Sequence, residues 1–191
     1  MKTEYPIIFS TPMVQALMEG RKTMTRRVVK MYATSDAPLI RQNAKWLMDN
    51  KTCPYGSIGT KLWVRESFSK VKDGLYLYKA NPEHGSMKWK PSIHMPKVAA
   101  RIWLEITNVK VERLQDISEG DAVKEGVESW VDERLKSKPT YYKNYDTSDA
   151  ESWYCSSPVT SFETLWEKIN GLGSFTTNPW VWVVEFRRIQ S

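Results

Sequence analysis

The clearest alternation of hydrophobic and polar positions lies near the end of the chain. It covers Trp180, Trp182, Val184 and Phe186, which alternate with Val181, Val183, Glu185 and Arg187. A period of two residues is typical of a β-strand whose two faces meet different surroundings. We therefore expect a strand over residues 180–188. Similar but shorter patterns predict strands over residues 7–10, 61–67, 75–79 and 99–111.

A second pattern has the period of an α-helix. It consists of hydrophobic residues spaced i, i+3, i+4 and i+7, namely Phe162, Leu165, Trp166 and Ile169. This spacing predicts a helix over residues 161–169 that packs on a core. Thr160 and Glu163 have the spacing of its capping box.

Two further helices are expected over residues 12–19 and 118–125. The first has Thr11 as a plausible N-cap, Pro12 at its first position and Gly20 after its end. The second has Ser118 as N-cap, Asp121 at the capping-box position and Gly126 as its stop. Several strands with a few short helices predict the α+β class.

A dense basic cluster directly follows the first helix. Arg21, Lys22, Arg26 and Arg27 stand among Thr23 and Thr25 in residues 20–27. One or two cations are enough to compensate the partial charge at a helix C-terminus, so this cluster indicates a site. An extended backbone would separate Lys22 from Thr25, whereas a tight turn would let them converge, and the sequence leaves both open. A solvated or merely phosphate-contacting turn is the simpler alternative.

These residues also carry a resemblance to a known family. The stretches at 6–13, 20–26, 59–66, 101–106 and 178–183 resemble, in the same order, motifs of the ASCH domain family. The resemblance is strongest to its larger form, often found in phages and prophages. It implies a small PUA-like β-barrel associated with RNA, here a single domain over residues 1–191 with insertions at about 31–55 and 129–158. Thr60 departs from the family pattern, which usually has Asp there.

Within that family, small bacterial amidohydrolases that act on N(4)-acetylcytidine use a Lys, a Thr three residues later and a Glu at the end of a later helix. The positions that match are Lys22, Thr25 and Glu125. The resemblance implies that Thr25 is a nucleophile, activated by a deprotonated Lys22. The negative end of a helix dipole would favour a neutral Glu125 as proton donor, and Arg26 would stabilise the oxyanion. Each residue has a structural alternative: a solvated Lys22, a turn-capping Thr25, an exposed Glu125, or an Arg26 paired with an acid.

Substrate contacts are expected from Arg21, Arg26 and Arg27, and from Trp63, Arg65 and Glu66 on the strand predicted over residues 61–67. Alternation places Trp63 and Arg65 on one face of that strand, and Val64 and Glu66 on the other. Glu66 would accept hydrogen bonds from a nucleobase and Trp63 would stack on one. The alternative is a core Trp63 with Glu66 ion-paired to an Arg.

The charge balance favours a polyanionic partner. The 191 residues carry a formal net charge of +6, with nine Trp and nine Tyr. A possible surface for single-stranded RNA comprises Lys88, Trp89, Lys90, His94, Lys97 and Arg101. A solvated connector is the alternative reading of that segment.

Three functions therefore stay open. The first is hydrolysis of the exocyclic amide of a modified nucleoside, the second is non-catalytic RNA binding, and the third is cleavage of single-stranded RNA. The polar, Tyr-rich and Trp-containing segment 129–158 is expected to be a lid or an interaction arm.

The remaining features point to no cofactor and no metal. Cys53 and Cys155 are isolated, which predicts neither a zinc site nor a disulfide framework and favours a reducing cytoplasm. The chain begins without an apolar leader-like stretch, and no window approaches 18 apolar residues. We therefore expect a cytoplasmic protein without membrane insertion. Its oligomeric state is left open.

Overall fold

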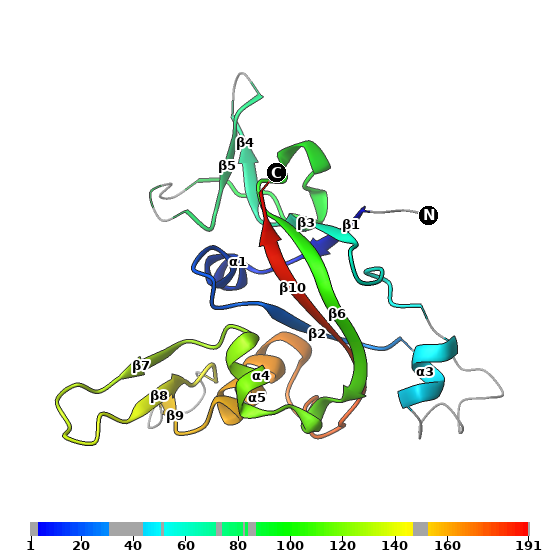
Figure 1. Cartoon of the computed structure of the whole chain (residues 1–191). Coiled ribbons are helices and arrows are strands. Elements are labelled where there is room, and N and C mark those ends of the chain that lie inside the picture. Colours follow the sequence, from blue (N-terminus) through cyan, green and yellow to red (C-terminus); the bar gives the residue numbers. More distant parts are fainter. Residues whose placement is uncertain are drawn as a thin grey trace. The chain divides into compact units, whose positions relative to one another are not determined.

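The computed structural model describes residues 4–30, 44–50, 52–71, 74–81, 83, 87–146 and 153–190. These residues form a mixed α+β structure with a five-stranded sheet, two smaller sheets and a few short helices (Figure 1). They group into two compact units. Unit 1 comprises residues 1–23, 52–109 and 184–191, and unit 2 comprises residues 24–51 and 110–183. The predicted α+β class is confirmed.

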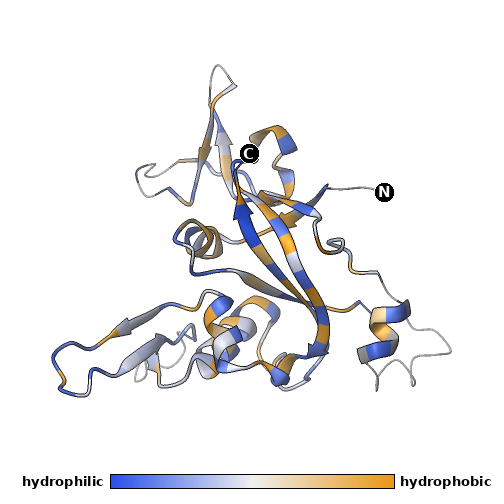
Figure 2. Cartoon of the chain, viewed as in Figure 1, coloured by the Kyte–Doolittle hydropathy of each residue, from blue (hydrophilic) through white to orange (hydrophobic). Residues whose placement is uncertain are grey.

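The five-stranded sheet has the order β1-β3-β6-β10-β2. Its strands are β1 (Glu4–Ile8), β2 (Met24–Val28), β3 (Lys61–Arg65), β6 (Trp103–Arg113) and β10 (Trp180–Ile189). β1 pairs with β3 in parallel, and β3 pairs with β6 in antiparallel orientation. Hydrophobic and hydrophilic residues alternate along much of β6 (Figure 2). In β10, the consecutive residues Val181–Val184 are all buried, so both faces of the strand are covered there.

Unit 1 begins with β1 and the helix α1 (Thr11–Met18). The N-cap of α1 is Ser10, so the prediction of Thr11 is wrong by one residue. Pro12 lies in the first turn, where its missing N–H costs no hydrogen bond. Gly20 follows the helix with a φ of 75°, as expected of a glycine that ends a helix. Val14, Ala16 and Leu17 are the buried residues of α1.

A smaller sheet in unit 1 pairs β4 (Phe68–Lys70) with β5 (Tyr76–Tyr78). Phe68 packs there with Met95 and Ala99. The latter two come from a segment with two 3-10 turns, η3 (Ser92–His94) and η4 (Lys97–Ala99). Residue 99, where the sequence predicts that a strand begins, is part of η4, and β6 begins four residues later at Trp103.

Unit 2 contains β2, α3 (Ala44–Asn50), the 3-10 turn η5 (Leu114–Asp116), α4 (Glu119–Lys124) and α5 (Pro158–Asn170). Helices α4 and α5 contact each other (Figure 1). The core of the unit includes Met24, Leu114, Ile117, Ala122, Val127, Tyr145, Phe162, Trp166, Phe175, Val181 and Val183.

Helix α5 begins three residues earlier than its hydrophobic period predicts. Its N-cap is Ser157, whose Oγ accepts a hydrogen bond from the Val159 N–H at 3.2 Å. The predicted capping box of Thr160 and Glu163 is therefore wrong. The predicted core face is confirmed for Phe162 and Trp166, which are buried, whereas Ile169 is 50% exposed.

The described parts of the two predicted insertions contain regular structure. Residues 44–50 form α3, and residues 129–155 contribute the antiparallel sheet β7 (Ser129–Val131), β8 (Thr140–Lys143) and β9 (Tyr154–Cys155). Residues 31–43, 51 and 147–152 of the insertions lie outside the described part of the chain. The single domain and the lid stay predictions.

None of the helices that the structure describes has both the length and the apolar character that a membrane crossing requires.

Candidate functional site

Arg26 is the centre of a buried ionic cluster in unit 2. It lies on β2, and its side chain has 0% exposure. Nε and Nη2 donate to Glu112 Oε1 at 3.1 and 2.6 Å, and Nη2 also donates to Asp121 Oδ2 at 3.0 Å. Nη1 donates to Glu125 Oε1 and to Met24 Sδ, both at 3.2 Å. Since a guanidinium has five N–H groups, these five bonds use all of its donors.

The cluster keeps Arg26 charged in spite of burial. Desolvation lowers the pKa of Arg26, but attraction by Glu125 and hydrogen bonds to Glu112 and Asp121 outweigh it and raise the pKa above its ordinary value. Lys110 adds a second cation, 2.8 Å from Glu112 and 3.6 Å from Asp121. Its pKa is also raised, because bonding to Glu112 outweighs desolvation. Lys124 is a third cation, 3.8 Å from Asp121, so three cations face three carboxylates among the described residues.

Helix α4 places two of these carboxylates. Its N-cap Ser118 accepts a hydrogen bond from the Asp121 N–H at 3.1 Å, as the sequence predicts. Glu125 is the C-cap residue and is 4% exposed, and Gly126 follows with a φ of 88°. The Glu125 side chain is ion-paired with Arg26 and accepts a hydrogen bond from it. The exposed alternative for Glu125 is wrong.

Thr25 shares β2 with Arg26. Of the two conformations considered for the basic segment, the backbone is extended over Met24–Val28. Met24, Thr25 and Arg26 are all buried on this strand. Thr25 is 2% exposed. Arg27 is half-buried on the same strand.

Lys22 belongs to unit 1, in the turn that follows α1. Its backbone N–H donates to the Ala16 carbonyl at 3.1 Å, which fixes this turn against the helix end. The side chain is buried, with 2% of the residue exposed, and its Nζ lies 5.6 Å from the centroid of the Phe9 ring. The solvated alternative for Lys22 is therefore wrong. Arg21, by contrast, pairs with the exposed Glu19.

A second buried carboxylate in unit 1 is Glu66, which is 1% exposed. Arg101 Nε and Nη2 donate to its two oxygens at 2.9 and 3.0 Å. Arg101 Nη1 donates to Asn81 Oδ1 at 2.7 Å, and its Cζ lies 4.0 Å from the Tyr78 ring centroid. Burial raises the pKa of Tyr78, with Arg101 opposing this effect and Glu66 adding to it. Glu66 is thus ion-paired with an arginine, Arg101, which was the structural alternative to a role in nucleobase binding.

The alternation predicted for residues 61–67 is confirmed. Val64 and Glu66 are buried, whereas Trp63 and Arg65 are half-buried on the other face. The Arg65 guanidinium lies 5.5 Å from the Trp63 ring centroid and donates to the Ile93 carbonyl. Thr60, the departure from the family pattern, accepts a hydrogen bond from the Ser57 N–H at 3.0 Å and so closes a turn.

In the segment predicted as an RNA surface, some side chains are exposed and others are ion-paired within the protein. Lys88, Lys90 and His94 are exposed, and Trp89 is half-buried. The backbone of Lys90 exchanges two hydrogen bonds with Phe68, which holds the segment at β4. Lys97 pairs with Glu4 and lies 5.4 Å from the Trp103 ring. Arg101 is engaged with Glu66.

No group of three or more His, Cys, Asp or Glu side chains in the described ranges is arranged to hold a metal ion. Cys53 and Cys155 are free and buried, and burial raises the pKa of both thiols.

Several members of these clusters were not singled out from the sequence as site residues. Glu112, Lys110, Tyr78 and Asn81 carry no local motif, and Asp121 was assigned to the helix cap alone. The one usable signal was the Arg-rich segment itself, because a buried Arg requires acidic partners.

Comparisons with protein-family models, with curated proteins and with solved structures found no match for this chain. Membership of the ASCH family stays a prediction.

Proposed function

We propose that the chain is an ASCH-type protein with a PUA-like barrel, and that it hydrolyses the exocyclic amide of an acylated cytidine-type nucleoside. One observation carries this proposal. Within the described residues, seven polar or charged side chains are buried, namely Lys22, Thr25, Arg26, Thr60, Glu66, Glu125 and Ser161. All three residues of the proposed Lys/Thr/Glu set are among them. Burial of polar groups is costly, so these positions are candidates for chemistry.

In the proposed reaction, Lys22 in its neutral form accepts the hydroxyl proton of Thr25 as Oγ1 attacks the carbonyl carbon of the acyl group. The C–N bond then breaks, and the leaving nitrogen takes up that proton. Water hydrolyses the acyl ester on Thr25 and restores the hydroxyl. Acylated cytidine and water thus give cytidine and a carboxylic acid, with no other reactant.

The ion pair with Arg26 changes the role that we propose for Glu125. A carboxylate that already accepts from Arg26 can relay a proton only by accepting it first. We therefore assign Glu125 to proton relay between Lys22 and the leaving nitrogen. Arg26 has all its donors in use, so we assign it to positioning of Glu125, and its proposed contact with the oxyanion is dropped.

The test is release of cytidine from N(4)-acetylcytidine, followed by chromatography. We expect turnover by the wild type and its loss in Lys22→Ala, Thr25→Ala and Glu125→Ala. Thr25→Ser is the matched control, since it keeps a hydroxyl nucleophile at the same position. Turnover by Thr25→Ala equal to that of the wild type would remove the proposed nucleophile.

Binding of single-stranded RNA is a second candidate function, favoured by the exposed Lys88 and Lys90 on either side of Trp89. Among the described residues, no carboxylate pairs with either lysine. Such a surface would contact phosphates, so RNA retention should fall steeply as salt rises, whereas hydrolysis of an uncharged nucleoside should respond little. The double variant Lys88→Gln/Lys90→Gln should weaken RNA retention and leave cytidine release unchanged.

A further inference from the structure

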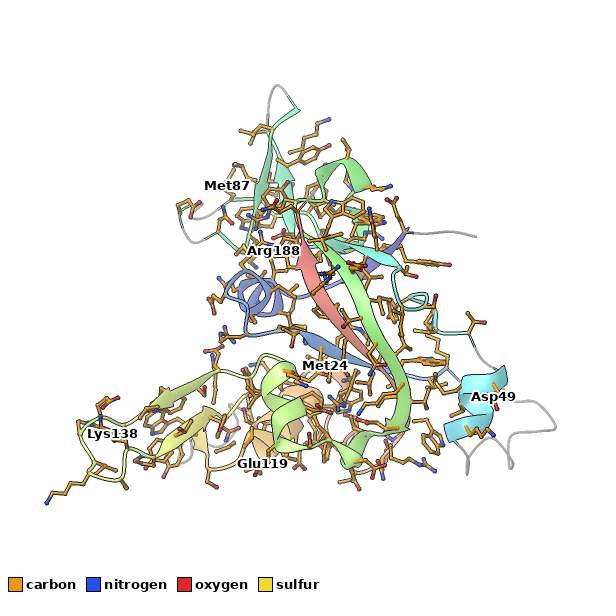
Figure 3. All side chains as sticks on the ribbon, in the orientation of Figure 1. Met24, Asp49, Met87, Glu119, Lys138 and Arg188 are labelled. Carbon is orange, nitrogen blue, oxygen red and sulfur yellow. The ribbon has the colours of Figure 1, made fainter. Side chains whose placement is uncertain are left out.

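Unit 1 contains a cavity that none of the residues proposed for hydrolysis lines. Its volume is about 570 Å³, and it is lined by Arg101, Arg188, Ile189 and Gln190. Arg188 and Ile189 belong to the C-terminal end of β10, where Figure 3 labels Arg188. The volume lies in the range of small-molecule sites. Of the lining residues that the structure describes, Arg101 and Arg188 are cationic and none is acidic.

Arg101 is held rigidly at this cavity. Three of its five N–H groups donate to Glu66 and Asn81, and Tyr78 covers one side of the guanidinium at 4.0 Å. One N–H on Nη1 and one on Nη2 remain beyond these bonds. Since the Arg101 side chain is still 25% exposed, a ligand can reach it. A fixed guanidinium loses little conformational entropy on binding.

The charge at the cavity comes mainly from Arg188. Glu66 neutralises Arg101, whereas no carboxylate in the described part of the chain pairs with Arg188. The neighbouring Arg187 differs, because it donates to Glu105 at 2.7 and 3.0 Å. Adjacent strand residues point to opposite faces, so these two arginines have separate surroundings. Counted over the residues that the structure describes, the cavity therefore has one cation more than its acidic partners.

We infer that this cavity binds a phosphate group, with Arg188 supplying the charge and Arg101 the oriented donors. Arginine matches the geometry of phosphate oxygens and forms short, charge-assisted hydrogen bonds to them. The phosphate belongs to a free nucleotide or to an RNA strand. In identifying the ligand as a nucleotide, this inference rests on the proposed function. It adds a phosphate-binding site on unit 1.

Calorimetric titration at low salt tests the inference. The ligands are cytidine 5′-monophosphate, cytidine, inorganic phosphate and an octacytidylate without terminal phosphate. We expect the wild type to bind the monophosphate at least about tenfold more tightly than cytidine, and Arg188→Gln to lose about tenfold of that affinity. Inorganic phosphate should compete with the monophosphate. The matched control is Arg187→Gln, which removes the same charge one residue away and should change the affinity less than about twofold.

Equal binding of cytidine and its monophosphate would overturn the inference, and so would equal losses in Arg187→Gln and Arg188→Gln. Preference for the monophosphate over the octamer supports a free nucleotide, and the reverse preference supports an RNA strand. Cytidine release from N(4)-acetylcytidine is measured on the same samples. Cytidine release without monophosphate binding contradicts only the inference that the cavity binds phosphate. Monophosphate binding without cytidine release contradicts only the proposed hydrolysis.

Discussion

Arg26 holds Glu112, Asp121 and Glu125 together through its five N–H groups. Replacing it by alanine leaves the three carboxylates near each other, with Lys110 and the more exposed Lys124 as the cations that pair with them in the described part of the chain. Because the removed charge is fully buried, we predict that Arg26→Ala lowers the free energy of unfolding by about 3 kcal/mol or more. Urea denaturation measures the change.

The control for Arg26 is Arg134, which pairs with Asp132 on an exposed turn of the same unit. Solvent screens such a pair, so Arg134→Ala should leave the urea midpoint unchanged. If both variants shifted the urea midpoint equally, the buried cluster would contribute no more to the free energy of unfolding than the exposed ion pair does.

At the scale of single residues, the sequence predicts contacts only where the signal is local. The cap of Asp121 by Ser118 is such a case, since the two residues stand three positions apart. Glu112, however, meets Arg26 across 86 positions, and nothing near Glu112 marks it. Asp121 was assigned to its cap because Ser118 is three residues away, while its pairing with Arg26 spans 95 positions. The burial of Lys22 could not be read from the sequence, which left both a site and a solvated turn open for this basic cluster.

Helix α5 offers a direct test of where its first turn begins. Ser157 caps the helix through the Val159 N–H, whereas Thr160 lies within it. We predict that Ser157→Ala lowers the free energy of unfolding by about 1 kcal/mol, while Thr160→Ala has a much smaller effect. Thermal unfolding of the two variants compares them. A larger loss in Thr160→Ala would support the start expected from the sequence.

The same helix carries a pH-dependent contribution. Burial, together with repulsion by Glu167, raises the pKa of Glu163 above its ordinary value of 4.5. The folded state therefore favours the protonated form, so this stabilisation is complete below pH 4.5 and is lost as the pH rises through the raised pKa. Glu163→Gln should thus raise the free energy of unfolding at pH 7 by a few tenths of a kcal/mol, about the size of an i,i+4 repulsion. At pH 3 the gain should vanish.

Urea titrations of wild type and Glu163→Gln at the two pH values provide the measurement. The exposed Glu133, which pairs with Lys138, serves as control through Glu133→Gln and should show no gain at pH 7. A gain for Glu163→Gln that persists at pH 3 would point to packing instead of charge.

At the scale of elements, segments with a long alternation or with clear signals at both ends were predicted well, and short strands were not. The helix expected over residues 118–125 is α4 (Glu119–Lys124), and the strand expected over residues 180–188 is β10. β2 has only five residues, two of them Arg, so its buried side is not visible as alternation. The sheet β7-β8-β9 was missed because its strands have two to four residues each, set in polar sequence.

At the scale of the whole molecule, the sequence predicted the class of the fold but not its division into compact units. Several strands and a few helices were enough for α+β. The boundary between the units, however, runs through β6 and β10, which are continuous strands without a linker composition. No Pro-rich, Gly-rich or Ser-rich segment marks that division. The barrel and the family stay proposals that rest on the order of five short motifs.

The central claim is that a buried lysine, with Thr25 and Glu125, performs amide hydrolysis. The most direct test is cytidine release from N(4)-acetylcytidine by the wild type and by Lys22→Arg, with thermal unfolding of both to confirm that they fold. Arginine keeps the positive charge but stays protonated, so it cannot accept the Thr25 proton. We predict turnover by the wild type and a loss of about 100-fold or more in Lys22→Arg. No release by the wild type, or equal release by a folded Lys22→Arg, would contradict the proposed function.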